Sequence, residues 1–270
     1  MKVAAVVILY NPTQEVLNNI STYRNSVDYV ICVDNSQTTT FSSYCKDYIY
    51  IPLFGNKGIA VALNIGIKYA EKLGCEWVLT MDQDSYFAND IVGIYKQYIL
   101  KGNTKVKMYC PTYIYSRSKN TVLNDRYIKY AMQSAALIDI SCFRQVGYFV
   151  EKLFIDVVDY EFCLRLIKNK AKILQVSSAK LIHSPAHTKS VSLFGFKLEY
   201  GCDSYVRYYY QARNLLYVFK IYHEPYLLFI LFVKFFKIIF LFDKKLNYLR
   251  FFKAGIKDGF ANNLGKCRIV

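Results

Sequence analysis

The chain has 270 residues, of which 54% are hydrophobic, enough for a sizeable core in one domain or one domain with an appendage. Its net charge of +15 is uneven: residues 1–100 carry 7 basic and 9 acidic residues, whereas residues 207–270 carry 12 and 3. The basic tail predicts an acidic or polyanionic partner, namely membrane lipid, a phosphorylated substrate or nucleic acid. The acidic first part argues against a basic stripe across the fold, so we expect no nucleic-acid binding.

Eight cysteines occur without a Cys-x-x-Cys pair, and several lie inside apolar runs, as Cys32 and Cys163 do. This pattern is typical of small buried thiols in a reducing compartment and argues against a disulfide framework. The chain also enters a strand pattern at Lys2 without a long apolar leader. The sequence therefore predicts a location on the cytosolic side.

Short apolar runs that end at turn residues alternate with helical patterns in the first part of the chain. The expected strands are residues 3–10, 29–33, 48–51 and 77–81, and the expected helices are residues 13–23, capped by Thr13, and 59–73. This β-α-β-β-α-β order predicts a doubly wound α/β sheet. Further along we expect helices at 90–100, 142–146 and 159–169, and strands at 108–115, 132–140, 171–176 and 180–183.

Three polar clusters follow expected strands, at residues 10–12, 34–36 and 82–84. Ligands of doubly wound sheets bind beyond the carboxyl ends of the strands, so these clusters are expected to share one edge. Asp82 and Asp84 alternate along an extended backbone and are expected to point the same way. Two carboxylates on one side suit a divalent cation, although short acidic triplets also occur at solvated strand ends.

The order of several motifs resembles that of a family 2 inverting glycosyltransferase with the GT-A fold. The motifs are VVILYN at 6–11, VDNS at 33–36, NKG at 56–58, DQD at 82–84 and DYEFCLR at 159–165. Residues 81–85 and 154–159 are most similar to the dTDP-rhamnosyltransferase branch. The resemblance covers residues 3–215 and implies a Rossmann-like, mainly parallel sheet flanked by helices.

The resemblance implies roles for the residues around this edge. Asp84 would bind Mg²⁺ or Mn²⁺ across the donor diphosphate, with His183 completing the metal shell. Asp34 would accept the N3–H of a uracil or thymine ring; alternatively it caps its own turn. Arg213 would reach the diphosphate, although a tyrosine-rich helix packed on the core also explains its surroundings. The other expected donor-binding residues are Tyr10, Asn11, Asn56, Gly58 and Asp82.

Asp159 is the expected catalytic base, six residues before Arg165, where the family's Glu-Asp-x-Asp pattern places its base. The chain departs from that pattern because Val158 and Glu161 replace the first Glu and the last Asp. Asp156 is therefore a rival for the base. Either aspartate also suits a helix cap.

Residues 226–242 are almost wholly apolar apart from Lys234 and Lys237, and they are short for a span, which needs about 20 apolar residues. We expect a helix lying in the membrane interface, with its lysines reaching the headgroups, or else a buried core or dimer helix. Residues 1–215 would form the transferase domain, with a nucleotide-sugar half at 1–115 and an acceptor half at 116–215. Residues 216–270 would be a basic, aromatic, membrane-associated helical tail.

The resulting prediction is a metal-dependent transfer of rhamnose, or a similar sugar, from a dTDP or UDP donor. The acceptor would be a glycan on a polyprenyl diphosphate at the inner face of the cell membrane. The nearest enzymatic rival is a nucleotidyltransferase, which would normally carry a Gly-rich, basic loop after the first strand; residues 10–13 are not such a loop. A basic, aromatic nucleic-acid binder is the rival from another class.

Overall fold

The computed structural model describes residues 1–115, 122–183, 188–193 and 196–268. Contacts divide the chain into two compact units. The first contains Met1–Phe149 and Phe162–Ser184, and the second contains Val150–Glu161 and Pro185–Val270. All eight cysteines are free, and seven of them are buried. The predicted division into a donor half, an acceptor half and a tail concerns function and stays a prediction.

The first unit is built on a mixed, mainly parallel sheet with the strand order β3-β2-β1-β4-β8-β6-β9-β5, with β7 beside β9. β1 to β4 run parallel, and β8 is antiparallel to both β4 and β6. The strands are β1 Val3–Leu9, β2 Tyr29–Asp34, β3 Ile49–Pro52, β4 Trp77–Asp82, β5 Ser85–Phe87, β6 Val106–Ile114, β7 Arg126–Tyr127, β8 Ala136–Asp139 and β9 Lys172–His183.

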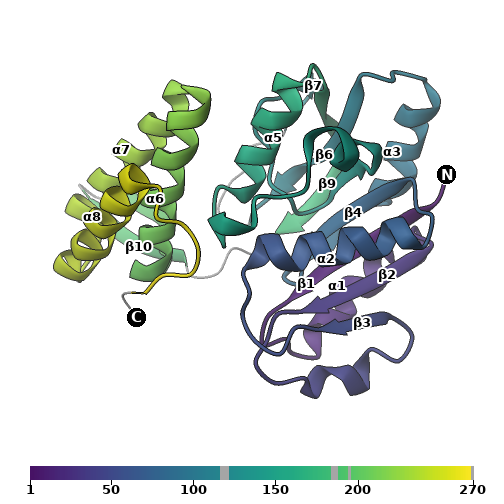
Figure 1. Cartoon of the computed structure of the whole chain (residues 1–270), viewed down its shortest axis with the longest axis horizontal. Helices are drawn as coiled ribbons and strands as arrows, with labels where there is room; N and C mark the ends of the chain where they lie inside the picture. The colour runs from purple at the N-terminus through teal and green to yellow at the C-terminus, as the bar shows by residue number, and fades with distance from the viewer. Residues whose placement is uncertain (116–121, 184–187, 194–195, 269–270) are drawn as a thin grey trace. The chain divides into compact units, whose positions relative to one another are not determined.

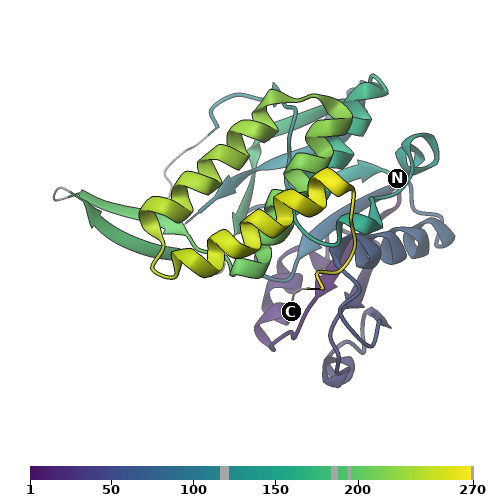
Figure 2. The ribbon, with the colours of Figure 1, turned by 60° about the vertical axis from the view of Figure 1, so that its left-hand side comes forward.

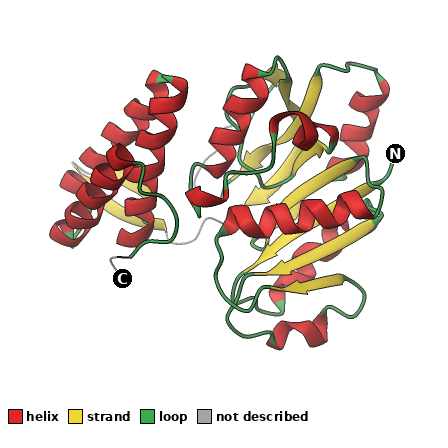
Figure 3. Ribbon diagram, in the orientation of Figure 1, coloured by secondary structure: helices red, strands yellow, loops and turns green. Residues whose placement is uncertain are grey.

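Helices cover both faces of this sheet (Figures 1 and 3). α2 packs on one face of the sheet, where Gly66 lies against Val6 of β1. Val7 of β1 points to the other face and belongs to the core that α1 and α3 cover. The helices of this unit are α1 Glu15–Arg24, α2 Ile59–Lys72, α3 Ile91–Leu100, α4 Ser141–Val146 and most of α5 Val158–Lys168, with a 3-10 turn at Thr40–Tyr44. The predicted α/β fold is thereby confirmed.

Gly66 lets α2 approach the sheet closely. A Cβ atom at this position would lie 2.3 Å from Val6 Cγ1 and 3.1 Å from Val33 Cγ2. We expect Gly66→Ala to lower the free energy of unfolding by about 1–3 kcal/mol, because overpacking outweighs the better helix propensity of alanine. Urea denaturation measures this, with the exposed Lys72→Ala as the matched control on α2. Equal stability of the two variants would contradict the close approach.

The second unit contains the hairpin β10 Thr188–Leu193 and β11 Phe196–Gly201, a 3-10 turn at Glu151–Leu153, and three long helices. These helices are α6 Tyr205–Tyr222, α7 Pro225–Leu241 and α8 Lys245–Ala261, which lie side by side (Figure 2). Their shared core comprises Tyr208, Ala212, Ile238, Phe242 and Phe252. No helix in the described part of the chain combines the length and apolar character needed to cross a membrane.

Several local expectations are wrong in detail. Gln14 rather than Thr13 precedes α1, and the two strands expected at 171–176 and 180–183 form the continuous strand β9. The strand expected at 132–140 is shorter in the structure and comprises only β8. It begins after Ala135, whose φ of 55° is incompatible with an extended strand.

Lys234 and Lys237 do not extend toward headgroups. The Lys234 ammonium lies 5.5 Å from the centre of the Tyr208 ring, and Lys237 donates to the Gly201 carbonyl. Burial lowers the pKa of Lys234. Both lysines therefore point into the second unit.

Candidate active site

The carboxyl ends of β1, β2 and β4 meet at one edge of the sheet, as predicted. In the parallel register, Leu9 lies beside Asp34 and Ile8 lies beside Asp82. Gln83 links two of the clusters, because its Oε1 accepts from the Tyr10 backbone N–H at 2.8 Å and its Nε2 donates to the Tyr10 carbonyl at 3.1 Å. The edge is thus a connected polar surface.

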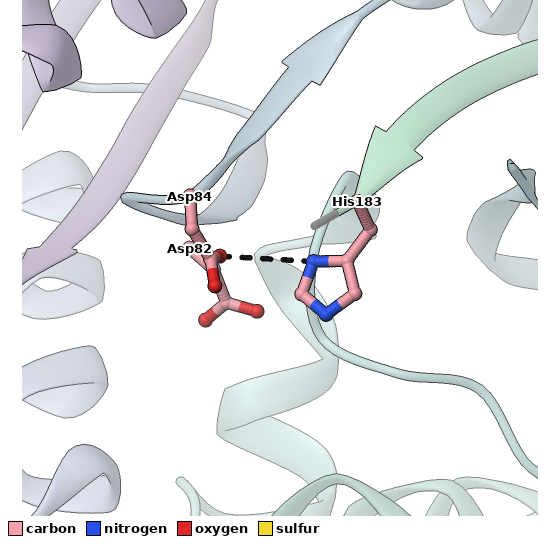
Figure 4. A group of neighbouring side chains, drawn as sticks. All are labelled: Asp82, Asp84 and His183. Atoms are coloured by element: carbon pink, nitrogen blue, oxygen red, sulfur yellow. Dashed lines mark ion pairs between the residues drawn. The ribbon is translucent and has the colours of Figure 1, made fainter. Parts of the chain in front are cut away.

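Within the described residues, Asp82, Asp84 and His183 form a group whose possible ligand atoms all lie within 4.8 Å of one another. Asp82 ends β4, Asp84 lies in the turn before β5, and His183 ends β9 (Figure 4). The Asp84 Oδ1 atom is 3.6 Å from His183 Nδ1. The two carboxylates therefore converge through a turn, although the prediction had them alternate along one strand.

Neighbouring side chains orient this group. Gln133 donates to Asp82 Oδ1, and the Ser85 hydroxyl lies 2.8 Å from His183 Nδ1. The Tyr115 ring meets the His183 ring edge-on at a centroid distance of 6.0 Å. None of these three neighbours was predicted from the sequence. Only Ser85 carried a local signal, since it directly follows Asp84.

The Asp82–Asp84–His183 group suits a divalent cation. Two carboxylates and an imidazole are ligand types that Mn²⁺ accepts, and Mg²⁺ is compatible with the carboxylates and usually retains several waters. The Asp84 side chain is 44% exposed, which leaves room for oxygen atoms from outside the protein. The donor set and spacing therefore fit a divalent metal ion that would also bind oxygen atoms from outside the protein.

Asp34 is almost fully buried and has local partners. Its Oδ1 accepts from the Ser36 backbone N–H at 2.9 Å, and its Oδ2 accepts from the Tyr50 hydroxyl at 2.6 Å. Burial and this hydrogen bond raise the pKa of Tyr50, so Tyr50 stays protonated as the donor. The turn cap that we considered as the alternative is thus present. The predicted contact of Asp34 with a uracil or thymine ring stays a prediction.

Asn35, which directly follows β2, holds the loop before α2. The Asn35 side chain donates to Asn56 Oδ1 at 3.2 Å and accepts from the Lys57 backbone N–H at 2.7 Å. Asn56 Oδ1 also accepts from the Gly58 N–H at 3.0 Å. Gly58 has a φ of 95°, which a side chain would strain. The loop places Lys57 just before the amino end of α2, where anions are favoured.

The expected base and its rival belong to the second unit and differ in their partners. Asp156 accepts two hydrogen bonds from Arg207, at 2.7 and 2.6 Å, so both of its oxygens are engaged. Asp159 lies within the first turn of α5 and accepts from the Tyr160 backbone N–H at 2.9 Å. Glu161 is buried and accepts from the Tyr222 hydroxyl at 2.7 Å. Asp156 is thus held by a two-pronged contact with a cation.

The predicted contact of Arg213 with a diphosphate is wrong for this conformation. Arg213 is fully buried within the second unit and donates to the carbonyls of Gly265 at 2.6 Å and Leu153 at 2.9 Å. Its guanidinium also lies 4.9 Å from the centre of the Tyr210 ring. Arg213 therefore stabilises the packing of α6. This agrees with the alternative interpretation, in which a tyrosine-rich helix packs on the core.

Comparison with known families identifies the chain. The sequence model described as glycosyl transferase family 2 matches residues 4–157, which is more than half of the chain. The chain belongs to glycosyl transferase family 2. It is an enzyme that transfers a sugar, and the matched span includes the three polar clusters at the sheet edge.

The similarity to curated relatives covers most of this chain. The chain is 30% identical over 247 residues to the dTDP-rhamnosyl transferase RfbF of Shigella flexneri, with 83% of this chain and 82% of the relative covered. It is 23% identical to the low-salt glycan biosynthesis hexosyltransferase Agl10 of Haloferax volcanii, with 97% and 92% covered. The predicted similarity to rhamnosyltransferases is confirmed.

Solved structures share the fold at lower identity. S. aureus TarS matches with a TM-score of 0.60 and 15% identity, over 96% of this chain and 43% of TarS. GalNAc-T7, solved with UDP, GalNAc and Mn²⁺, matches with a TM-score of 0.55 and 12% identity, over 72% of this chain and 44% of GalNAc-T7. The chain thus spans less than half of the length of these two structures.

Proposed function

We propose that this family 2 transferase moves rhamnose from dTDP-rhamnose to a hydroxyl group of a glycan, with inversion at the anomeric carbon. The observation that carries the proposal is the convergence of Asp82, Asp84 and His183 at the sheet edge. The 30% identity to a dTDP-rhamnosyl transferase supports the choice of donor. A UDP-sugar is the second candidate donor.

In the proposed reaction, Asp84 and His183 would hold Mg²⁺ or Mn²⁺, and Asp82 would lie nearer to the ribose or sugar of the donor. The bound cation would supply Lewis-acid stabilisation of the departing nucleoside diphosphate. Tyr10 and Asn11 are exposed at the same edge, and we propose that they contact the donor. Asn56 and Gly58 shape the loop that approaches the phosphates. The hydrogen bonds of Gln133 and Ser85 keep the Asp82 and His183 side chains oriented.

The attacking hydroxyl group must lose its proton as it bonds to the anomeric carbon, and Asp159 is the proposed general base. The carbon–oxygen bond to the acceptor forms as the bond to the diphosphate breaks, so no covalent enzyme intermediate arises. Asp156 remains the rival for this role, and both of its oxygens accept from Arg207.

A donor screen tests the donor assignment. Nucleotide sugars are added with Mg²⁺ or Mn²⁺, and thermal stabilisation of the enzyme is measured. Because a ligand bound only to the folded state raises the melting temperature, dTDP-rhamnose should stabilise most, and only with the cation. Stronger stabilisation by a UDP-sugar would contradict the dTDP assignment. A nucleotidyltransferase would instead release pyrophosphate from a nucleoside triphosphate.

We further propose that α7 contacts a membrane that carries a polyprenyl-diphosphate-linked acceptor. Seven apolar side chains of this helix are between 38% and 72% exposed: Tyr226, Phe229, Phe232, Val233, Phe235, Phe236 and Phe240. Five basic residues in and just before α8 are exposed and complement anionic headgroups: Lys244, Lys245, Arg250, Lys253 and Lys257. Aromatic exposure and positive charge together favour a lipid surface as the partner of this helix.

Charge on the α7 face should prevent membrane binding. We expect Phe232→Glu/Phe236→Glu to lower co-sedimentation with phosphatidylglycerol–phosphatidylethanolamine vesicles by about tenfold or more, because the apolar contact is lost. These substitutions are preferable to deleting residues 226–270, since Ile238, Phe242 and Phe252 form the core with α6. The matched control is Leu100→Glu/Leu123→Glu, whose leucines are 85% and 84% exposed in the first unit. Unchanged co-sedimentation of the α7 variant would refute lipid binding. If the wild type is a dimer and only the α7 variant is a monomer, this face serves self-association instead.

A further inference from the structure

The segment just before α5 has an unfavourable backbone conformation. Phe154, Asp156 and Val157 have φ values of 67°, 64° and 65°, and none of them is glycine. A positive φ is rare for a β-branched residue such as Val157. Such conformations persist only where the surroundings hold them in place, and they are concentrated at functional sites. Neighbouring groups must therefore hold this segment.

The Asn214 side chain of α6 holds the backbone of this segment. Its Nδ2 atom donates toward the carbonyls of Leu153 at 2.9 Å, Ile155 at 2.8 Å and Asp156 at 2.9 Å. Asn214 is fully buried. Because one amide group donates toward three nearby carbonyls, a shorter or apolar side chain at 214 would remove the donor that they share.

The side chain of the segment is held as well. Arg207, seven residues before Asn214 on α6, forms a two-pronged ion pair with Asp156, and Gln211 Nε2 lies 3.3 Å from Asp156 Oδ1. Residues 207, 211 and 214 are spaced by about one turn, so they share one face of α6. This face therefore fixes both the main chain and the side chain of Asp156.

We propose that Asn214 is a positioning residue for sugar transfer. By holding segment 154–157 in its strained conformation, Asn214 sets where α5 begins and thus where Asp159 lies in the first turn. Arg207 supports the same arrangement through Asp156. The inference rests on the proposed role of Asp159 as the base, and all of its contacts lie within the second unit.

The variant Asn214→Ala tests this role. We expect kcat to fall about 10- to 100-fold, because a small displacement of a catalytic group is costly, while the donor KM changes by less than about twofold. The acid limb of the kcat–pH profile should also move, since the surroundings of Asp159 change. The matched control is Asn64→Ala: Asn64 is 2% exposed and its amide bonds the Phe149 backbone in both directions. That control should lose stability while kcat stays within about threefold of the wild type.

Strain relief provides a rescue test. Val157→Gly makes the positive φ favourable, so adding it to Asn214→Ala should restore at least about a third of the lost kcat. Arg207 is partly exposed, so Arg207→Lys should fold even if Asn214→Ala does not. Lysine keeps the charge but loses the two-pronged contact with Asp156, so kcat of this variant should fall. A kcat of Asn214→Ala equal to that of Asn64→Ala, or an unchanged kcat of Arg207→Lys, would overturn the positioning role. Full turnover by Asp159→Asn would instead overturn the base assignment itself.

Discussion

Replacing Asp159 with asparagine is expected to abolish sugar transfer and to leave donor binding intact. An amide has almost the same shape as a carboxylate but cannot accept the proton of the acceptor hydroxyl group. Since a positioned general base contributes about 10²- to 10⁴-fold to the rate, kcat should fall by that factor. The measurement is steady-state release of nucleoside diphosphate, together with calorimetric titration of the donor and Mn²⁺.

The matched control for this substitution is Glu161→Gln. Glu161 lies two residues further along α5 and is buried against the Tyr222 hydroxyl group. Glutamine can still accept that hydrogen bond, so this variant should retain most of the activity. If Asp159→Asn turns over normally while Asp156→Asn does not, Asp156 is the base and the ion pair with Arg207 does not suppress its reactivity.

Replacing Asp84 with asparagine is expected to remove the cation and with it the stabilisation of the leaving group. Loss of one such electrostatic contact typically costs about 10²- to 10³-fold in kcat. Asp84 should have the larger effect within the group, because it is the more exposed carboxylate and lies in the turn next to His183. Affinity for Mn²⁺, followed by electron paramagnetic resonance with dTDP present, should fall in parallel with kcat.

An exposed carboxylate of the same unit, Asp47, provides the control for Asp84. Asp47→Asn also removes one negative charge, so it separates loss of a metal ligand from a change in net charge. It should leave the Mn²⁺ affinity and kcat within about twofold of the wild type, as surface substitutions usually do. Equal Mn²⁺ affinity of Asp84→Asn and Asp47→Asn would contradict the metal site.

The fold and the sheet edge follow from local sequence patterns. The apolar runs of β1, β2 and β4 are continuous and give way to Asn, Asp and Pro residues, so the sequence alone locates their carboxyl ends. The parallel order places these ends together as a consequence of topology. Asp82 and Asp84 could therefore be predicted to share an edge with Asp34.

Contacts between distant segments could not be predicted in this way. Gln133 lies 51 residues from Asp82, and Tyr50 lies 16 residues from Asp34. Neither glutamine nor tyrosine carries a local signal that names its partner. The short strand β5 was missed for the same reason, because it exists through antiparallel pairing with the end of β9.

Arg213 shows how a motif can mislead about a role. An arginine followed by asparagine after three tyrosines suggests anion binding, yet the guanidinium donates to two backbone carbonyls in the interior of the second unit. Burial, rather than residue type, decides between these roles. The neighbouring Asn214 has the more informative contacts, and its place in the motif does not indicate which backbone carbonyls it bonds.

Turnover of dTDP-rhamnose with and without a divalent cation tests metal-dependent transfer most directly. The enzyme is incubated with the donor and a polyprenyl-diphosphate-linked glycan, first with EDTA and then with Mg²⁺, and the products are followed by NMR. We expect dTDP and a rhamnoside of inverted anomeric configuration to form together, only with the cation, and not with Asp84→Asn. Transfer that proceeds equally well in EDTA, or a product that keeps the configuration of the donor, would contradict this mechanism.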